Sequence, residues 1–546
     1  MNLKKLNIIC IVFIFMDAGL AYSQQQTLKR EVSERLICTI DVSSYINRSF
    51  KVSSDGLRVT YTVLSNDKWC VIVDGVEGKL YDGISEGTPI FSSDGRRVAY
   101  GAQSDEKWCI VADGSEGNFY DSILKGTPIF SPDGNRIAYG AQSDEKWCVV
   151  ADDIEGNFYD GILKGTPIFS PDSKRIAYGV QFGEKWYVVV DGIEEKFYDG
   201  ISEGTPIFSP DGKRVAYGAR SGEKWCVVVE SIEGKFYDGI LKGTPIFSPD
   251  GKNIAYGAQS GEKWCVVVDS IEGKFYDGIL KGDPIFSPDS KRVMYSAQSG
   301  NKRCVVVDGI EGKLYDDISE GTPIFSPDGK RFAYGAQLNN KWCVVVDGVE
   351  GKFYDGISNG TPIFSPDGKR SAYGAQSGEK WCAVIDSIEG KFYDGILEGD
   401  PIFSPDSRRV AYGTRLSNKL CVVVDGIEGK LYDGISEGSP IFSPDGKRIA
   451  YGAQSGEKWC VIVDGVEGKF YDGISEGSPI FSPDGRWVAY GAQSIGKCCI
   501  VVDGVEGIFY DGFVSYIFFN SPESFHCLAV TGSNIFNIYL VEERIK

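Results

Sequence analysis

Residues 204–242 read GTPIFSPDGKRVAYGARSGEKWCVVVESIEGKFYDGILK. This 39-residue unit recurs along nearly the whole chain of 546 residues, with no insertion or deletion between copies. One proline marks the copies, at positions 89, 128, 167, 206, 245, 284, 323, 362, 401, 440 and 479. Self-similarity at a fixed period of this length is the signature of repeat architectures. The repeat therefore indicates the fold class more directly than the total chain length does.

Each unit contains the pattern of four short strands. Pro206–Phe208 predicts a first strand, which ends at Ser209–Gly212 because proline and glycine favour a tight turn there. Lys213–Ala219 alternates as a second strand, Trp225–Val229 is apolar on both faces as a third, and Lys235–Asp238 is the fourth. Four antiparallel strands in about 40 residues, repeated many times, are typical of propeller blades. The sequence therefore predicts an all-β fold, a β-propeller of four-stranded antiparallel blades.

The array has twelve full units and one partial unit. Phe50 stands where the proline belongs in the first unit, and Phe518 replaces it in the last. Thirteen units exceed the four to eight blades of a typical ring. We therefore expect two tandem propellers of six or seven blades, over residues 50–283 and 284–546, with one large or open ring as the alternative.

The first residues are typical of an export signal. Residues 1–23 contain two lysines, a mostly apolar run at Leu6–Met16 and small residues at Ala21–Ser23, which together predict a secretory signal peptide. No other stretch approaches the roughly 20 apolar residues that a membrane-spanning helix needs. We therefore expect a periplasmic or secreted protein with no transmembrane segment in the mature chain.

Residues 24–49 form a segment between the predicted signal peptide and the array. Within it, Leu36–Val42 has the pattern of an isolated strand. Propeller rings commonly close by pairing strands from opposite ends of the chain. This strand is therefore a candidate for completing the last, unfinished blade.

One motif carries a family resemblance. The string Ser-Pro-Asp-Gly-Lys-Arg-x-Ala-Tyr, intact at Ser209–Tyr217 and Ser443–Tyr451, resembles the WD-like repeat of exported bacterial TolB-type β-propellers. The resemblance spans the array from Phe50 onward, and it implies a propeller that binds other molecules. The α/β domain that precedes the propeller in TolB itself has no counterpart in this sequence.

The sequence offers no convincing set of catalytic residues. His526 is the one histidine; it aligns with an arginine of most other units, such as Arg448, and we expect it at the surface or at an edge. Gly-x-Ser-x-Gly strings such as Gly83–Gly87 fall in connections between strands, without the strand-to-helix turn and histidine that a nucleophile needs. We therefore predict no enzyme, no catalytic residue, no cofactor-binding residue and no cofactor.

Eleven of the fifteen cysteines occupy one repeat position. Free cysteine commonly acts as a small buried hydrophobe, and we expect that role here. Cys38 and Cys527 leave open a disulfide across the chain ends in an oxidising compartment. No convincing set of zinc ligands is present, so no metal residue is assigned.

Aspartates recur in the turn after the marker proline. Asp in tight turns usually accepts hydrogen bonds from its own backbone two residues on, so we assign these a structural role in the turn. Calcium bound by oxygen ligands is the alternative. The structural-turn positions are Asp94, Asp133, Asp172, Asp211, Asp250, Asp289, Asp328, Asp367, Asp406, Asp445 and Asp484.

Tryptophan recurs at the start of the third strand, next to a polar turn. Packing between blades is the favoured interpretation, because large aromatic side chains mostly contribute buried area. A ring of exposed tryptophans beside carboxylates would instead suit the faces of sugars. The candidate ligand contacts are Trp69, Trp108, Trp147, Trp186, Trp225, Trp264, Trp342, Trp381 and Trp459.

Net charge of −19 argues against partners that need basic patches, namely nucleic acids and anionic membranes. The sequence favours an exported, non-enzymatic propeller that acts as a protein-binding scaffold in the periplasm or cell envelope. A multivalent lectin-like propeller that binds glycans or peptidoglycan is the first alternative, and a propeller-type hydrolase is the second.

Overall fold

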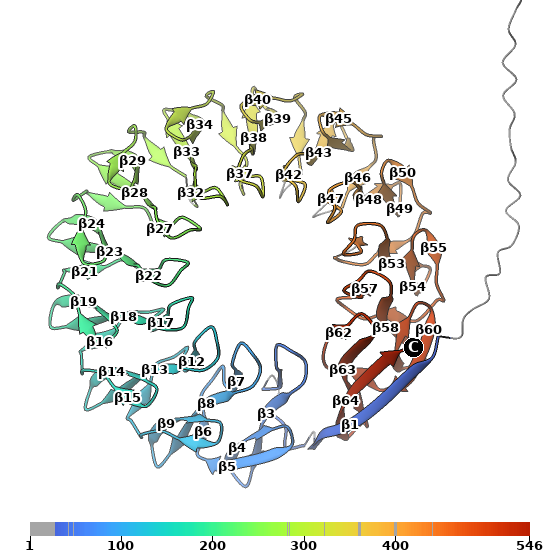
Figure 1. Cartoon of the computed structure of the whole chain (residues 1–546), viewed down its shortest axis with the longest axis horizontal. Helices are drawn as coiled ribbons and strands as arrows, with labels where there is room; N and C mark the ends of the chain where they lie inside the picture. Colours follow the sequence, from blue (N-terminus) through green and yellow to red (C-terminus); the bar gives the residue numbers. More distant parts are fainter. Residues whose placement is uncertain are drawn as a thin grey trace, which may run out of the picture.

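The computed structural model describes residues 28–41, 43–46, 49–280, 282, 284–321, 323–358, 362–397, 401–438 and 440–546. These residues form thirteen antiparallel sheets, which stand as blades around a single ring (Figure 1). The described residues form strands and turns and no helix. The prediction of an all-β propeller is therefore confirmed, while the preferred division into two rings is not supported and the alternative of one large ring fits. Residue 283, at the expected division, lies outside the described residues.

One blade shows the pattern of most others. It contains β6 (Gly83–Ile84), β7 (Ile90–Phe91), β8 (Val98–Ser104), β9 (Lys107–Ala112) and β10 (Ser115–Glu116). The sheet order is β10-β9-β8-β6, and β7 also pairs with β8, so β6 and β7 pair with the two ends of the same edge of β8. The later blades of this kind are β11–β15 (122–155), β16–β20 (161–194), β21–β25 (200–233), β26–β30 (239–272), β31–β35 (278–311), β36–β40 (317–350), β41–β45 (356–389), β46–β50 (395–428), β51–β55 (434–467) and β56–β60 (473–510).

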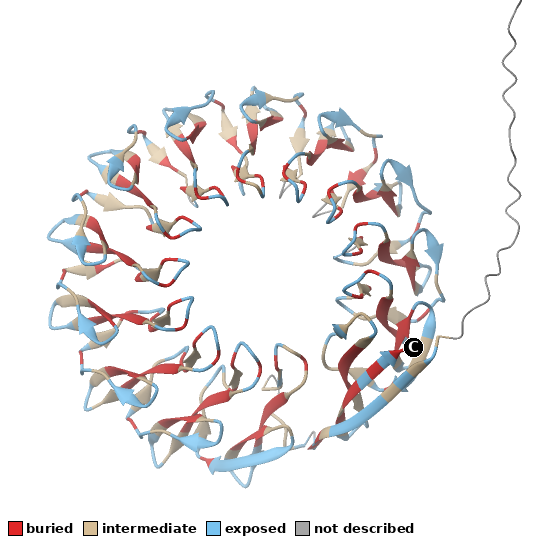
Figure 2. Cartoon of the chain, viewed as in Figure 1, coloured by how far each residue is buried: buried red, intermediate tan, exposed pale blue. Residues whose placement is uncertain are grey.

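The core lies between neighbouring blades. One cluster joins Val71 and Tyr81 of one blade with Val98, Tyr100 and Cys109 of the next. Comparable clusters recur around the ring because the second and third strands are apolar on both faces. Figure 2 shows the buried residues along these middle strands and the exposed ones at the outer edge. Each blade is therefore stabilised by its two neighbours, as in other repeat proteins.

The ring closes at a seam between the two ends of the array. The first blade contains β2 (Lys51–Val52), β3 (Val59–Ser65), β4 (Lys68–Val73) and β5 (Val76–Tyr81). The last blade contains β61 (Gly512–Phe513), β62 (Phe518–Ser521), β63 (Ser524–Thr531) and β64 (Ile535–Ile545), and β1 (Arg30–Asp41) is its outermost strand.

Strand β1 pairs antiparallel with β64 along its whole length, from Arg30 opposite Ile545 to Asp41 opposite Ile535. The register shifts once, between Leu36 and Cys38. The predicted closing strand is thus confirmed over residues 36–41 and begins earlier, at Arg30; residue 42 lies outside the described residues. The predicted signal peptide, 1–23, also lies outside them. In the part of the chain that the structure describes, no helix is long and apolar enough to cross a membrane.

Candidate functional site

Grooves of the same kind lie between neighbouring blades at three places in the ring. Their volumes are about 730, 460 and 400 Å³. The first groove is lined by Asp74 and Glu77 from one blade and by Tyr100 and Asp113 from the next. Equivalent residues line the others: Asp152, Glu155, Tyr178 and Asp191 in the second, and Asp269, Glu272, Tyr295 and Asp308 in the third. The groove is therefore a property of the repeat.

An arginine ties each groove to the blade that follows. Arg97 Nε donates to Asp113 Oδ2 over 2.8 Å, while its Nη1 donates to the carbonyl of Asn135 in the next blade over 2.6 Å. The guanidinium also lies 5.3 Å from the centre of the Phe130 ring. Val98 N donates to the other oxygen of Asp113, so both carboxylate oxygens already have donors. This aspartate stabilises the junction between blades.

A second set of polar contacts crosses between blades near the outer edge. Lys79 Nζ and Tyr81 OH each donate to Glu116 Oε1 over 2.9 Å. The Lys79 ammonium holds the pKa of Glu116 below its usual range. Burial, followed by this carboxylate, raises the pKa of Tyr81. The walls of the groove are thus fixed by charged hydrogen bonds, which are stronger than neutral ones.

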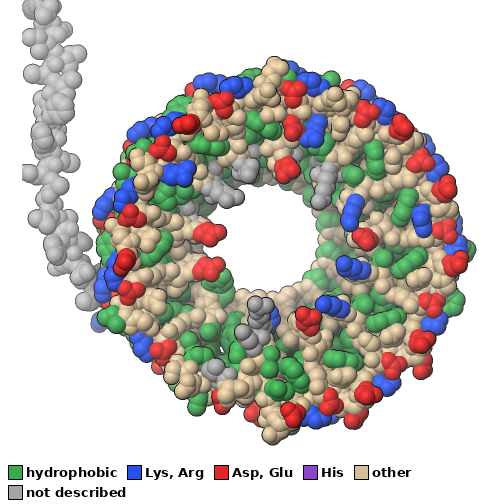
Figure 3. All heavy atoms as spheres, turned by 180° about the vertical axis from the view of Figure 1, so that it is seen from behind, with side chains coloured by type: hydrophobic (Ala, Val, Ile, Leu, Met, Phe, Trp, Pro, Cys, Tyr) green, Lys and Arg blue, Asp and Glu red, His purple; other side chains and the backbone are tan. Residues whose placement is uncertain are grey.

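Apolar side chains stand exposed beside the grooves. The fourth strand begins with Val76, Ile154 and Ile271 in the three blades concerned, and their exposed fractions are 71, 74 and 74%. The same position is similarly exposed in most other blades. Figure 3 shows apolar side chains interspersed with lysine, arginine and acidic side chains around the ring. Most blades therefore expose one aliphatic side chain at the same position of the repeat.

All nine predicted tryptophans are half-buried at the start of the third strand. The position faces the next blade, because Arg303, which replaces tryptophan in one unit, forms an ion pair with Asp317 of the following blade. Trp186 and Trp264 pack against buried clusters between blades. A role for these residues in contacting a ligand stays a prediction.

The aspartates of the proline turn are held by their own turns. Asp94 Oδ1 accepts from Ser92 Oγ over 2.6 Å and from the amide of Arg96 over 3.1 Å, and the Ser92 hydroxyl lowers the pKa of Asp94. The described residues hold no group of three or more His, Cys, Asp or Glu side chains suited to a metal ion. The same two turn bonds form at Asp133, Asp172, Asp211, Asp250, Asp289, Asp328, Asp367, Asp406, Asp445 and Asp484.

A family model described as "TolB beta propeller domain" matches residues 121–321. Over these residues, somewhat more than a third of the chain, the repeats are similar to those of TolB β-propellers. Among solved structures, TolB from Acinetobacter baumannii is 20% identical with a TM-score of 0.22, over 48% of this chain and 77% of that one. A eukaryotic initiation factor is 13% identical with a TM-score of 0.30, over 61% of this chain and 94% of that one. A search of curated proteins finds no match.

The one histidine of the sequence is buried, so the expectation of a surface or edge position was wrong. His526 is 3% exposed and stacks on Phe518, with the ring centres 5.4 Å apart. Its Nε2 lies 2.7 Å from the carbonyl oxygen of Asp55 in the first blade, and its Nδ1 lies 2.8 Å from Asn520 Oδ1. Equivalent arginines bond to a carbonyl of the following blade, and the imidazole makes the corresponding contact across the seam.

The cysteines at the repeat position are buried and free, as predicted. Burial raises the pKa of Cys109 to about 11. Cys38 and Cys527 are free as well, and they lie on β1 and β63, which are separated by β64. Cys38 is opposite Ile538 and Cys527 is opposite Val541. The structure therefore contains no disulfide between them.

Proposed function

We propose that this protein is an exported, non-enzymatic scaffold that binds other proteins in the periplasm or cell envelope. The observation that carries the proposal is the recurrence of one groove in three blade pairs, each with an exposed valine or isoleucine beside it. The TolB-like repeats support the same class of function. The partner covers the aliphatic side chains at the outer edge and meets the charged walls of the grooves.

Because the same exposed side chain recurs from blade to blade, contacts that are weak one by one are sufficient together to hold a partner. Burying one valine or isoleucine side chain contributes about 1.5–3 kcal/mol at most, which alone gives a short-lived complex. A partner that spans several blades gains further contacts at high effective concentration, without any single strong site. The rigid spacing of the blades fixes the distance between successive contacts.

The absence of catalysis is part of this proposal. Ser85, in the first of the Gly-x-Ser-x-Gly strings, lies in the connection between β6 and β7, and its amide donates to the carbonyl of Gly101. His526, the one imidazole of the sequence, has both ring nitrogens within hydrogen-bond distance of Asn520 and Asp55. It is therefore not placed to take a proton from any of those serines.

Isoleucines at the same hairpin position of three adjacent blades, which we call the hairpin isoleucines, provide the test. A variant with Ile154→Ser, Ile193→Ser and Ile232→Ser removes the exposed apolar side chain at this position from three adjacent blades, the first of which borders the second groove. Ile495→Ser is the matched control, because Ile495 is 92% exposed but lies in the turn between the second and third strands. Both proteins and the wild type are immobilised, exposed to envelope extracts, and their retained proteins quantified by mass spectrometry.

We expect the triple variant to lose at least about tenfold of the retained partner, equivalent to about 1.4 kcal/mol, and the control to retain it. Circular dichroism checks that both variants are folded. Equal retention by all three proteins would overturn the proposal. Binding of glycans or peptidoglycan fragments with quenching of tryptophan fluorescence, and no retained protein, would favour the lectin-like alternative.

A further inference from the structure

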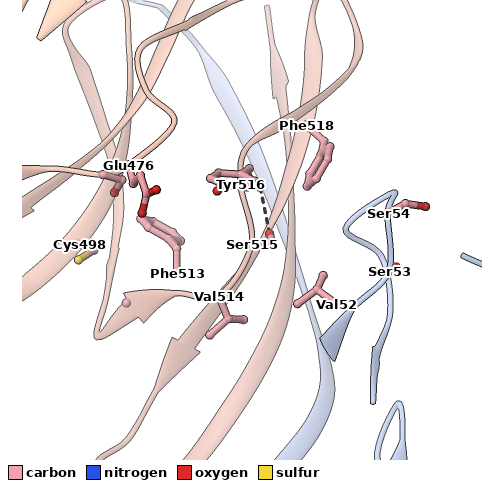
Figure 4. A pocket seen from close by; sticks show the side chains of 12 residues that line it. Val52, Ser53, Ser54, Glu476, Cys498, Phe513, Val514, Ser515, Tyr516 and Phe518 are labelled. Atoms are coloured by element: carbon pink, nitrogen blue, oxygen red, sulfur yellow. Dashed lines mark hydrogen bonds between the residues drawn. The ribbon is translucent and has the colours of Figure 1, made fainter. Parts of the chain in front are cut away.

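A cavity of about 830 Å³ lies at the seam, where the last blade meets both of its neighbours. Its lining includes Val52 of the first blade, Glu476 and Cys498 of the β56–β60 blade, and aromatic residues of the last blade. In Figure 4, Glu476 and Phe513 lie beside Tyr516, and Phe518 lies on the other side of the cavity, toward Val52. The seam pocket, as we call this cavity, occurs where the repeat pattern changes.

Two changes in sequence create the seam pocket. Cys498 stands where nine other units have tryptophan, and this position faces the following blade, so the volume of an indole is missing between the blades. The last unit also places aromatic residues where the preceding unit has Ile474, Gly477 and Pro479. Those aromatic residues are Phe513, Tyr516 and Phe518.

The aromatic side chains are supported from behind. One face of Phe518 is covered by the His526 ring at an interplanar angle of 14°. The Tyr516 ring lies over Gly477, so that a Cβ atom built on this glycine would stand 2.8 Å from it. Tyr516 is nevertheless 60% exposed. Its exposed surface is therefore available at the pocket.

Glu476 brings an uncompensated negative charge to the pocket. The same repeat position is paired in two other blades, where Glu86 lies 3.1 Å from Lys125 and Glu203 lies 3.2 Å from Lys242 of the following unit. In the last unit the partner position is Ser515, and Glu476 forms no ion pair with any described residue. Figure 3 shows acidic side chains at several places around the central opening.

We propose that the seam pocket binds a positively charged lysine or arginine side chain of a partner polypeptide. The faces of Phe513, Tyr516 and Phe518 attract a cation through their quadrupoles, and the Glu476 carboxylate supplies the opposite charge. An anion would meet the unpaired carboxylate, and a purely apolar group would leave that carboxylate without a partner. The net charge of −19 favours the approach of cationic segments. This assignment rests on the proposed protein-binding function and adds one specific contact to it.

The probe is a fluorescent peptide of alternating lysine and glycine, compared with a peptide that carries norleucine in place of lysine. Binding to the purified full chain is followed by fluorescence polarisation. Glu476→Gln removes the proposed counter-charge, whereas Glu86→Gln removes one charge at the same repeat position in a blade where it is already paired. Cys498→Trp restores the residue of the other units and fills the pocket, and Tyr516→Gly restores the glycine.

We expect Glu476→Gln, Cys498→Trp and Tyr516→Gly each to weaken binding of the lysine peptide at least about fivefold. Glu86→Gln should change it less than about twofold. Equal losses for Glu86→Gln and Glu476→Gln, unchanged binding by Cys498→Trp, or equal binding of the norleucine peptide would overturn the proposal. If envelope proteins are still retained through the hairpin isoleucines in that case, the scaffold function stands without this pocket.

Discussion

Arg30 and Glu543 form a buried ion pair that joins the two ends of the chain. Arg30 Nε lies 2.6 Å from Glu543 Oε2, and the two side chains are 6% and 2% exposed. Arg30 Nη1 also donates to the carbonyls of Ile500 and Val505 in the adjacent blade. The seam is therefore held by a charge pair between β1 and β64 and by hydrogen bonds to the blade beside them.

Removing one partner of this pair should open the seam. Glu543→Gln leaves the Arg30 guanidinium buried without a counter-charge, which costs about 3–5 kcal/mol. We expect amide hydrogen exchange in β1 and β64 to accelerate strongly, while the blades on the opposite side of the ring change little. Glu31→Gln is the control, because Glu31 pairs with Lys546 at an exposed site that contributes about 0–1 kcal/mol. Equal acceleration in the two variants would contradict the role of the buried pair.

Removing β1 should expose the edge of the last blade. A chain that lacks residues 28–41 leaves the hydrogen-bonding edge of β64 unpaired, and such edges associate with other chains. Size-exclusion chromatography with light scattering should show dimers or larger species that the full-length chain does not form. A deletion of residues 1–27 alone, which keeps β1, should remain like the full-length chain. A monomeric product of the longer deletion would show that the seam does not depend on this strand.

Acid should destabilise the ring. The Lys79 ammonium lowers the pKa of Glu116, and the Ser443 hydroxyl lowers the pKa of Asp445 to about 2, with similar shifts in other units. Because these carboxylates bind protons less readily in the folded state, their stabilisation is present above the unfolded pKa values of about 4 and is lost as pH falls through the folded values. The melting temperature should be level from about pH 7 to 5 and fall steadily from about pH 4 to 2. A rise in that range would contradict the assignment.

Among the described cysteines, Cys498 should react fastest with an alkylating reagent. Cys498 is half-buried, whereas the other described cysteines are buried, and burial raises the pKa of thiols such as Cys265 to about 11. Since the thiolate is the reactive form, brief alkylation of the folded protein at about pH 8 should modify Cys498 first among the described cysteines. Mass spectrometry before and after denaturation measures the difference. Early modification of Cys109 or Cys265 would show that the blades open readily.

The repeat predicted the blades well because each strand is determined by local alternation and turn residues. The isolated strand near Leu36 also predicted the closure. The number of rings could not be predicted from the sequence, because it depends on the small angle between neighbouring blades. Side-chain packing sets that angle. His526 was placed wrongly because its unit departs from the repeat. The grooves arise only when two blades meet in space, although Cys498 in the tryptophan position was a visible signal of the seam pocket.

The contacts that close the ring at the seam do not depend on the number of blades in the ring. The described contacts between the chain ends involve the first blade, the last blade with β1, and the β56–β60 blade beside it, whereas the other blades only continue the pattern. Gain or loss of one whole 39-residue unit would leave those contacts intact and change the ring by one blade. The width of the central opening can therefore evolve in steps of one blade, by recombination between nearly identical coding segments. The contacts that join the chain ends stay the same in each step.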